Sequence, residues 1–215
     1  GNVLVGLDVG TTKTCVIVGE IIESGIDIIG SSSCPSNGMR KGMVVNIEST
    51  VSSIKKAVDM AEHESGYSIR SVYVGIAGTH IRGQNSLGIG QVKDREIDEE
   101  DMERAIEAAK AVAVPMDREI LHAVPQDFMV DDQDGIRNPI GISGVRLEAN
   151  VHIVTGSIAS IQNIINVVNK AGLDINEIVL EQLAASEAVL SSDEKDLGVA
   201  LVDIGGGTTN IAIFV

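Results

Sequence analysis

Two short segments of the sequence carry the residue types that bind phosphate together with a hydrated divalent cation. One reads Leu-Asp-Val-Gly-Thr-Thr over residues 7–12, and the other reads Val-Asp-Ile-Gly-Gly-Gly-Thr-Thr over residues 202–209. Glycines let a turn approach an anion with bare backbone, and consecutive N–H groups in such a turn form a concave anion site. Threonine hydroxyls add donors, and Asp8 and Asp203 supply hard oxygens for Mg²⁺. Two facing copies would clamp a polyphosphate.

An apolar run precedes and follows each segment, at residues 3–5 and 15–18 for the first copy and at residues 199–201 and 211–214 for the second. This pattern predicts a hairpin of two buried strands joined by a Gly-Thr-Thr turn, used twice. A single copy is also what an ordinary turn would show, because glycine and threonine are common turn residues. The duplication, with aspartate leading both copies, favours phosphate binding. Neither copy is a Walker loop.

The paired segments resemble the two phosphate motifs of the ATPase superfamily that includes actin, the heat-shock chaperones and the sugar kinases. Three stretches, residues 6–20, 94–150 and 198–214, are similar to the FtsA family of bacterial cell-division proteins. The likeness runs essentially end to end, yet it covers only about the first half of a family member. It implies an α/β fold: an actin-like (ribonuclease H-like) lobe with a mixed sheet and flanking helices.

The resemblance also implies roles for individual residues, with ATP and Mg²⁺ as cofactors. Asp8 and Asp203 hold the Mg²⁺, through water. Glu181 matches the position at which relatives orient the attacking water, although an acidic residue at a helix N-terminus is favourable in any case. Lys13 either reaches a phosphate as a point charge or is an exposed turn lysine. The residues expected to grip phosphate are Gly10, Thr11, Thr12, Lys13, Gly205, Gly206, Gly207, Thr208 and Thr209.

Two positions depart from the family pattern. Asn210 stands where the second motif usually continues with aspartate, and Gln182 stands where proline often follows the glutamate. Loss of the acidic side chain at residue 210 weakens the ordering of water or metal near the terminal phosphate. It does not remove a phosphate clamp.

The elements that would position these residues form an α/β layer, residues 1–79 and 158–215, interrupted by an insert. Strands are expected at residues 3–8, 14–20, 26–32 and 72–76, with a loop over 33–45. A helix follows Asn46, a good N-cap, and ends at Gly66. After the insert, we expect a helix capped by Ser157 and ending at Gly172, a short strand at 178–180, a short helix at 182–190 and a solvated turn at 191–196.

The insert, residues 80–157, is expected to be a small α+β subdomain of order β-α-β-β, which is the place of the subdomain that the FtsA family calls 1C. Its elements are a Gly-rich strand at 81–92, a helix after Asp98, an edge strand at 119–130 interrupted by Pro125, and an alternating strand from Val145 to Ile153. The odd-numbered residues of that last strand face the core. The even-numbered ones, Arg146 to His152, give a wet face.

The composition excludes several classes of function. The chain has 215 residues with 16 basic and 31 acidic side chains, a net charge of −15, which argues against nucleic acid or an anionic membrane surface as a direct partner. Only two cysteines occur, so a reducing compartment is expected. The four histidines show no ligand spacing, and we expect no transition-metal site.

Two functions follow from the resemblance. The first is an ATP-binding assembly protein of cell division that links the FtsZ ring to the membrane and recruits later division proteins through the insert, residues 80–157. It would be cytoplasmic and peripheral on the inner membrane. The alternative is a small-molecule phosphotransferase, a sugar or acetate kinase of the same superfamily. The wet sheet face of the insert suits protein contact better than catalysis.

The resemblance covers only the first lobe, and this limits the expected activity. The adenosine contacts, the subdomain that receives FtsZ, and the C-terminal amphipathic helix that reaches the membrane all belong to parts of the family outside this stretch. We therefore expect weak or unmeasurable ATP binding and no ATPase activity from these 215 residues. Whether the parent protein hydrolyses ATP stays open. Exposed strand edges and apolar surface predict self-association.

Overall fold

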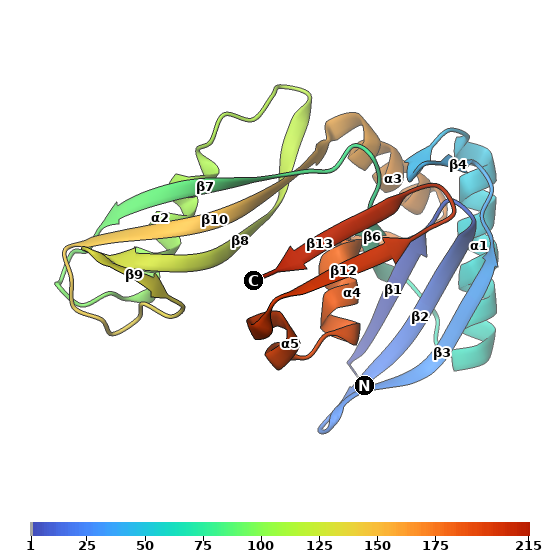
Figure 1. Ribbon diagram of the computed structural model, residues 1–215. Coiled ribbons are helices and arrows are strands. Elements are labelled where there is room, and N and C mark those ends of the chain that lie inside the picture. Colours follow the sequence, from blue (N-terminus) through green and yellow to red (C-terminus); the bar gives the residue numbers. More distant parts are fainter. Residues whose placement is uncertain (1) are drawn as a thin grey trace. The chain divides into compact units, whose positions relative to one another are not determined.

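The computed structural model describes residues 2–215 and divides into two compact units (Figure 1). The first unit contains the described residues up to His80 together with Ala159–Val215, and the second contains Ile81–Ile158. Both phosphate segments lie in the first unit. No helix of residues 2–215 is long and apolar enough to cross a membrane.

A five-stranded mixed sheet forms the centre of the first unit. Its strand order is β11-β6-β1-β2-β3, in which β1 runs antiparallel to β2 and parallel to β6. Strand β11 is parallel to β6, and β3 is antiparallel to β2. The strands are β1 (Val3–Val9), β2 (Lys13–Ile22), β3 (Gly25–Pro35), β6 (Ser71–Ile76) and β11 (Asp174–Leu180).

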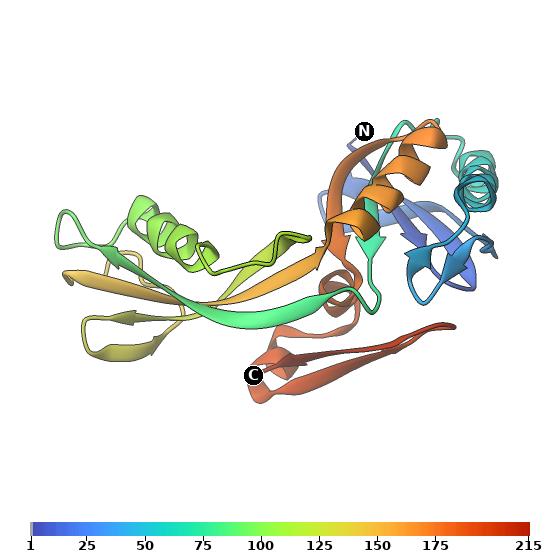
Figure 2. The same cartoon turned by 90° about the horizontal axis from the view of Figure 1, so that it is seen from above.

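Helices α1 (Ile47–Ser65) and α3 (Ile158–Lys170) pack against one face of this sheet, and the C-terminal hairpin lies on the side away from them (Figure 2). The apolar stripe of each helix meets the inward side chains of the strands, so one aliphatic core forms. Its buried members include Leu7, Val16, Val18, Val72, Val74, Ile54, Ala57, Ala61, Ile164, Val167 and Val168.

The predicted ends of α1 are confirmed. Asn46 lies in an extended conformation, and its side-chain oxygen accepts the N–H of Ser49 at 2.9 Å, which satisfies a donor that the first helical turn leaves free. Gly66 ends the helix with φ of 68°, a left-handed conformation that glycine adopts without strain.

Two segments expected to lack regular structure contain short elements. The expected loop 33–45 includes a small ribbon of β4 (Met39–Arg40) and β5 (Met43–Val44), which turns at Lys41 and Gly42, both with positive φ. The expected turn at 191–196 is instead helix α5 (Ser192–Leu197), because Ser191 and Glu194 form a capping box. It follows α4 (Glu181–Val189).

The prediction of a second hairpin of buried strands is wrong. Strands β12 (Val199–Ile204) and β13 (Thr209–Phe214) pair only with each other in the described chain, outside the five-stranded sheet. One face packs on α4, while the other is open to solvent. The side chains on that open face are Val202, Ile204, Ile211 and Ile213, which are 51%, 79%, 64% and 70% exposed.

The second unit is an antiparallel sheet with one helix, and its strand order is β7-β10-β8-β9. It therefore has one strand more than the expected β-α-β-β order, because β9 folds back between the expected strands 119–130 and 145–153 and pairs with the end of β8. The elements are β7 (Arg82–Gln91), α2 (Glu99–Lys110), β8 (Arg118–Val130), β9 (Gln133–Ile136) and β10 (Arg146–Ser157).

The alternation predicted for β10 is confirmed in its centre and wrong at two positions. Leu147, Ala149, Val151 and Ile153 are fully buried in the core that the sheet forms with α2. Val145, expected in the core, is exposed because it precedes the strand, and Glu148, expected on the wet face, is buried and paired with Arg146.

Of two further predictions for this unit, the cap at Asp98 is confirmed, whereas the interruption of the strand at Pro125 is wrong, and that strand lies at the sheet edge only where β9 does not reach it. Asp98 caps α2, and a capping box links it to Asp101. Strand β8 is continuous through Pro125, which pairs with Val151 of β10, whereas β9 reaches back only to Phe128. The missing N–H of Pro125 therefore costs no ladder hydrogen bond on its other side.

A close approach of β7 to α2 gives a test of this unit. A Cβ at Gly88 would overlap the backbone oxygen of Ala105 and lie 2.5 Å from the nitrogen of Ala109, whereas a Cβ at Gly90 would meet nothing nearer than 3.6 Å. We expect Gly88→Ala to destabilise the unit by about 3 kcal/mol, because helix backbone cannot move aside easily. Hydrogen exchange of the α2 and β7 amides measures the change.

The matched control is Gly90→Ala on the same strand, which we expect to change stability by less than about 1 kcal/mol. Equal effects of the two substitutions would show that α2 does not press on β7 at Gly88.

Candidate functional site

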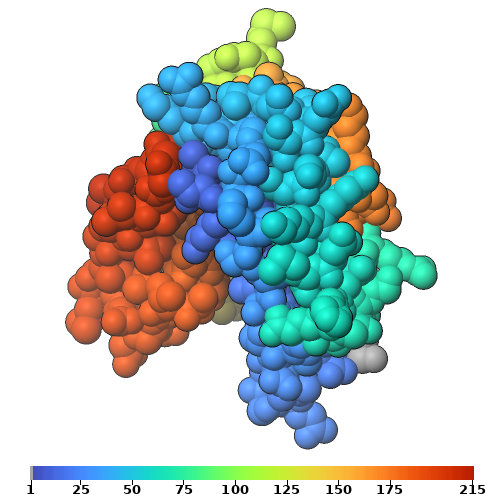
Figure 3. Space-filling model, turned by 90° about the vertical axis from the view of Figure 1, so that its right-hand side faces the viewer, coloured from blue at the N-terminus to red at the C-terminus, as the bar shows by residue number. Residues whose placement is uncertain are grey.

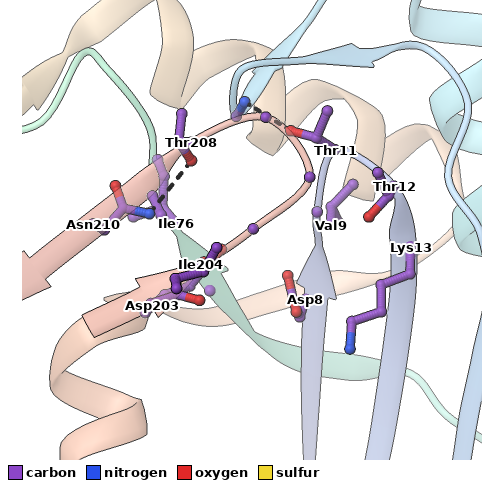
Figure 4. Close-up of a pocket in the computed structure, with 18 of the residues that line it drawn as sticks. Asp8, Val9, Thr11, Thr12, Lys13, Ile76, Asp203, Ile204, Thr208 and Asn210 are labelled. Atoms are coloured by element: carbon purple, nitrogen blue, oxygen red, sulfur yellow. Dashed lines mark hydrogen bonds between the residues drawn. The ribbon is translucent and has the colours of Figure 1, made fainter. Parts of the chain in front are cut away.

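The fold brings the two predicted phosphate turns into contact. They line one cavity of about 180 Å³, together with the end of β6 and the start of α4 (Figure 4). A Cβ at Gly206 would overlap the methyl group of Thr12, and one at Gly207 would lie 2.7 Å from the hydroxyl of Thr11. The red surface of the hairpin meets the dark-blue N-terminal turn in Figure 3. Glycine is required here by the neighbouring loop.

The two turns are also built alike. Gly10 donates its N–H to the carbonyl of Lys13 at 3.0 Å, and Gly205 donates to the carbonyl of Thr208 at 2.9 Å. In both, the leading aspartate lies two residues before that glycine. The sequence duplication therefore corresponds to a duplicated local structure, with each turn closing a two-stranded hairpin.

All but one of the predicted site residues line the cavity. The exception is Thr209, which is exposed as the first residue of β13, while the following residue, Asn210, faces inward. Lys13 lines the cavity and its side chain is exposed. The predicted residues that lie together are Asp8, Gly10, Thr11, Thr12, Lys13, Glu181, Asp203, Gly205, Gly206, Gly207 and Thr208.

Three carboxyl groups meet in this cavity. Burial, followed by the nearby carboxylates of Asp8 and Asp203, raises the pKa of Glu181 to about 8. Burial also raises the pKa of Asp8, with Lys13 opposing and Asp203 adding to the effect. One oxygen of Asp8, Oδ1, is buried and accepts no hydrogen bond. The cavity therefore concentrates negative charge that the protein itself leaves only partly compensated.

Asp8, Asp203 and Glu181 do not form a direct coordination shell. Within residues 2–215, no group of three or more His, Cys, Asp or Glu side chains is arranged to hold a metal ion directly. The same carboxylates can accept hydrogen bonds from the water shell of a cation. Mg²⁺ keeps several waters in many phosphate sites, so this arrangement suits it better than a dehydrated ion.

Sequence reasoning missed two glycines at the cavity. Gly42, in the turn between β4 and β5, donates its N–H to the hydroxyl of Thr11 at 3.1 Å, so that the hydroxyl proton of Thr11 remains free to donate into the cavity. Gly75 lies within β6, where a Cβ would stand 3.0 Å from the Glu181 side chain. A glycine inside an apolar strand was the available signal for Gly75.

Gln182 was noted only as a departure from a family pattern. The structure buries it beside Glu181, and its amide nitrogen lies 3.4 Å from Oδ2 of Asp203. The Asn210 amide donates to the hydroxyl of Thr208 at the same distance. Both departures thus contact residues of the second turn.

Comparison with known proteins gives a match to both parts of the chain. Residues 78–155 match the model of the SHS2 domain inserted in FtsA. The chain is 53% identical to the cell division protein FtsA of Pseudomonas aeruginosa over 215 residues, 42% identical to that of Escherichia coli K12 over 214, and 45% identical to that of Bacillus subtilis over 212. These alignments cover 100%, 99% and 98% of this chain and 52%, 51% and 48% of the relatives. The chain thus spans about half of their length.

Solved structures agree on the fold. The chain is similar to a protein of the PilM–PilN type IV pilus biogenesis complex, with a TM-score of 0.68 at 15% identity over 98% of this chain and 57% of that one. It is also similar to the ethanolamine utilization protein EutJ from Carboxydothermus hydrogenoformans, with a TM-score of 0.53 at 15% identity over 100% of this chain and 48% of that one. The fold is therefore the expected actin-like α/β fold. Together with the sequence identities and the inserted domain, this shows that the chain belongs to the FtsA family of cell-division proteins.

Proposed function

We propose that the cavity between the two glycine-rich turns binds the phosphates of Mg-ATP, and that this binding serves an assembly protein of cell division. The observation that carries the proposal is the contact of two equivalent turns, each with an aspartate two residues before its closing glycine. A single such turn is common, whereas two that share one cavity form a clamp with backbone donors on both sides.

The donor set fits a polyphosphate with its cation. The N–H groups of both turns and the hydroxyls of Thr11, Thr12 and Thr208 would bind phosphate oxygens, and Lys13 would add a charge at the rim. Asp8 and Asp203 would hold the waters of Mg²⁺, which supplies the positive charge that this acidic cavity lacks. The unpartnered Oδ1 of Asp8 supports this assignment, because a buried oxygen without a partner costs free energy.

Glu181 would orient a water beside the terminal phosphate. Its pKa of about 8 keeps it protonated at neutral pH in the chain alone, and a bound cation would lower that pKa toward the ordinary range. Thr209 is left out of the phosphate contacts, because its side chain lies outside the cavity.

The cavity is large enough to enclose only part of a nucleotide. Its volume of about 180 Å³ is below the roughly 300 to 1,000 Å³ typical of sites that enclose a whole small molecule. The adenosine contacts would then lie in the remaining half of the protein, as would the FtsZ-binding subdomain and a membrane-binding helix. We infer that the whole protein is cytoplasmic and peripheral on the inner membrane, where it links the FtsZ ring to the membrane.

The SHS2 insert would recruit the later division proteins. The small-molecule kinase alternative is not favoured, because the curated relatives cited above are all named cell division protein FtsA.

The phosphate site is tested by titrating Mg-ATP into the isotopically labelled chain. We expect NMR shifts of the amides in both turns, residues 10–13 and 205–208, with a dissociation constant in the millimolar range, because the adenosine contacts are missing. Asp8→Asn and Asp203→Asn should each weaken binding by about tenfold, the loss of one charged contact. We expect no measurable ATP hydrolysis.

The matched control is Asp27→Asn, an exposed aspartate of β3. It should leave the titration unchanged. Absence of turn shifts at tens of millimolar Mg-ATP would overturn the phosphate site, and low-micromolar binding would show that this half needs no further adenosine contacts.

Protonation of Glu181 predicts a pH dependence of stability. Its folded pKa of about 8 lies above its ordinary 4.5, so between these pH values the folded state binds a proton that the unfolded state has released. The contribution of this group to the free energy of unfolding must fall as pH rises from about 4.5 to 8. Urea unfolding should show Glu181→Gln becoming more stable relative to the unsubstituted chain across this window. A constant difference from pH 5 to 9 would contradict the raised pKa.

The open face of the C-terminal hairpin predicts self-association. Val202, Ile204, Ile211 and Ile213 form a contiguous apolar ribbon on strands that pair only with each other in the described chain. Sedimentation should show concentration-dependent dimers that Ile204→Lys with Ile213→Lys converts to monomers. The control substitutes exposed Ile26 of β3 with lysine, and equal effects of the two changes would move the contact away from the hairpin.

A further inference from the structure

Gln182 is a buried polar side chain whose role the phosphate clamp does not explain. It is the second residue of α4 and is only 5% exposed. Buried glutamine is unusual, because an amide loses hydrogen bonds to water when it leaves the surface. Its Nε2 lies 3.4 Å from Oδ2 of Asp203, on a different strand and 21 residues along the chain.

The hairpin that carries Asp203 has little else to fix it. Strands β12 and β13 form no ladder with the five-stranded sheet, and their outer face is open. Their contacts within the first unit include those with α4, the glycine-rich turn, and Lys195 of α5, whose Nζ lies 5.5 Å from the centroid of the Phe214 ring. A hydrogen bond from α4 to Asp203 therefore links the hairpin to the helix that directly follows β11 of the five-stranded sheet.

The Gln182 amide suits a position surrounded by carboxylates. Asp203 shares the cavity with Asp8 and Glu181, so a carboxylate at residue 182 would add repulsion, and an ammonium group would compete with a cation. An amide donates a hydrogen bond without adding charge. Because the Gln182 amide donates to Oδ2 of Asp203, Oδ1 and the remaining lone pairs stay free to face the cavity.

We propose that Gln182 is a positioning residue of the phosphate site: its amide holds the Asp203 carboxylate, and with it the second glycine-rich turn, against α4. The effect on ligand binding rests on the proposed function above, whereas the effect on the hairpin can be measured without any ligand.

The first experiment measures hydrogen exchange in the ligand-free chain. Gln182→Met keeps the length of the side chain and removes the donor, so the amides of residues 199–204 and 209–214 should exchange about tenfold faster, the effect of one lost hydrogen bond. Amides of β1 and β6 should not change. The matched control is Gln162→Met on the exposed face of α3, which should leave the hairpin unaffected.

A swap of the two groups separates hydrogen bonding from packing. Gln182→Glu alone faces Asp203 with a like charge and should loosen the hairpin at least as much as Gln182→Met. Adding Asp203→Asn to Gln182→Glu restores one donor and one acceptor with nearly the same atoms, so exchange should return toward the original rate. A role limited to filling space would show no such rescue, since all of these side chains have similar size.

The second experiment measures Mg-ATP binding by the same NMR titration as above. Gln182→Met should weaken binding by about fivefold to tenfold, because Asp203 and its turn are no longer held in place. The swapped variant should regain hairpin protection but not affinity, since residue 203 is then no longer anionic. If Gln182→Met fails to fold, the swap and Gln182→Glu carry the same comparison.

The outcomes distinguish the two proposals. Unchanged hairpin exchange in Gln182→Met, or no rescue by the swap, overturns the positioning role. Faster exchange in a chain that shows no Mg-ATP shifts supports the positioning role and overturns the phosphate site. Faster exchange with undiminished Mg-ATP affinity would show that the contact holds the hairpin but does not serve the ligand, which also overturns the inference as stated.

Discussion

The contact between two glycine-rich turns is the constraint on which the site depends. Gly206 and Gly207 approach Thr12 and Thr11 so closely that a Cβ at either glycine would collide with the threonine. The first turn is rigid because β1 and β2 are central strands of a five-stranded sheet. The second turn belongs to a separate hairpin, so the clamp has one fixed side and one side that α4 must hold. This asymmetry explains why a buried amide on α4 matters.

The charges of the cavity follow from the same geometry. Bringing the turns together brings Asp8 and Asp203 into one partly buried space with Glu181. Burial raises the pKa of Asp8 and of Glu181, Asp203 adds to both shifts, and Asp8 adds to that of Glu181. The folded chain tolerates this by keeping Glu181 protonated and by placing Lys13 at the rim. A hydrated cation would offset the same repulsion, because its positive charge attracts all three carboxylates. On the function proposed above, the cavity would therefore suit an anion that arrives with its metal.

Local signals predicted much of this from the sequence. The caps at Asn46 and Asp98, the alternation in the centre of β10 and the duplicated aspartate-glycine segments each depend on a few neighbouring residues, and each is present in the structure. The exposure of the second hairpin could not be predicted in this way. Its strands are apolar on both faces, which shows that both faces suit burial and says nothing about what covers them. Thr209 was expected to contact phosphate, but alternation along β13 places its side chain on the exposed face, outside the cavity.

The residues that sequence reasoning missed act across the fold. Gly42 is distant in sequence from Thr11, whose hydroxyl it orients, and its φ of 75° with close packing against Ala77 and Gly78 becomes evident only in three dimensions. Those two residues follow β6, whose end lines the cavity, and the chain enters the second unit at Ile81. One turn thus touches both the Thr11 hydroxyl, which lines the cavity, and the segment that follows β6. Gly42 and Gly78 pack backbone against backbone here, and neither position leaves room for a side chain.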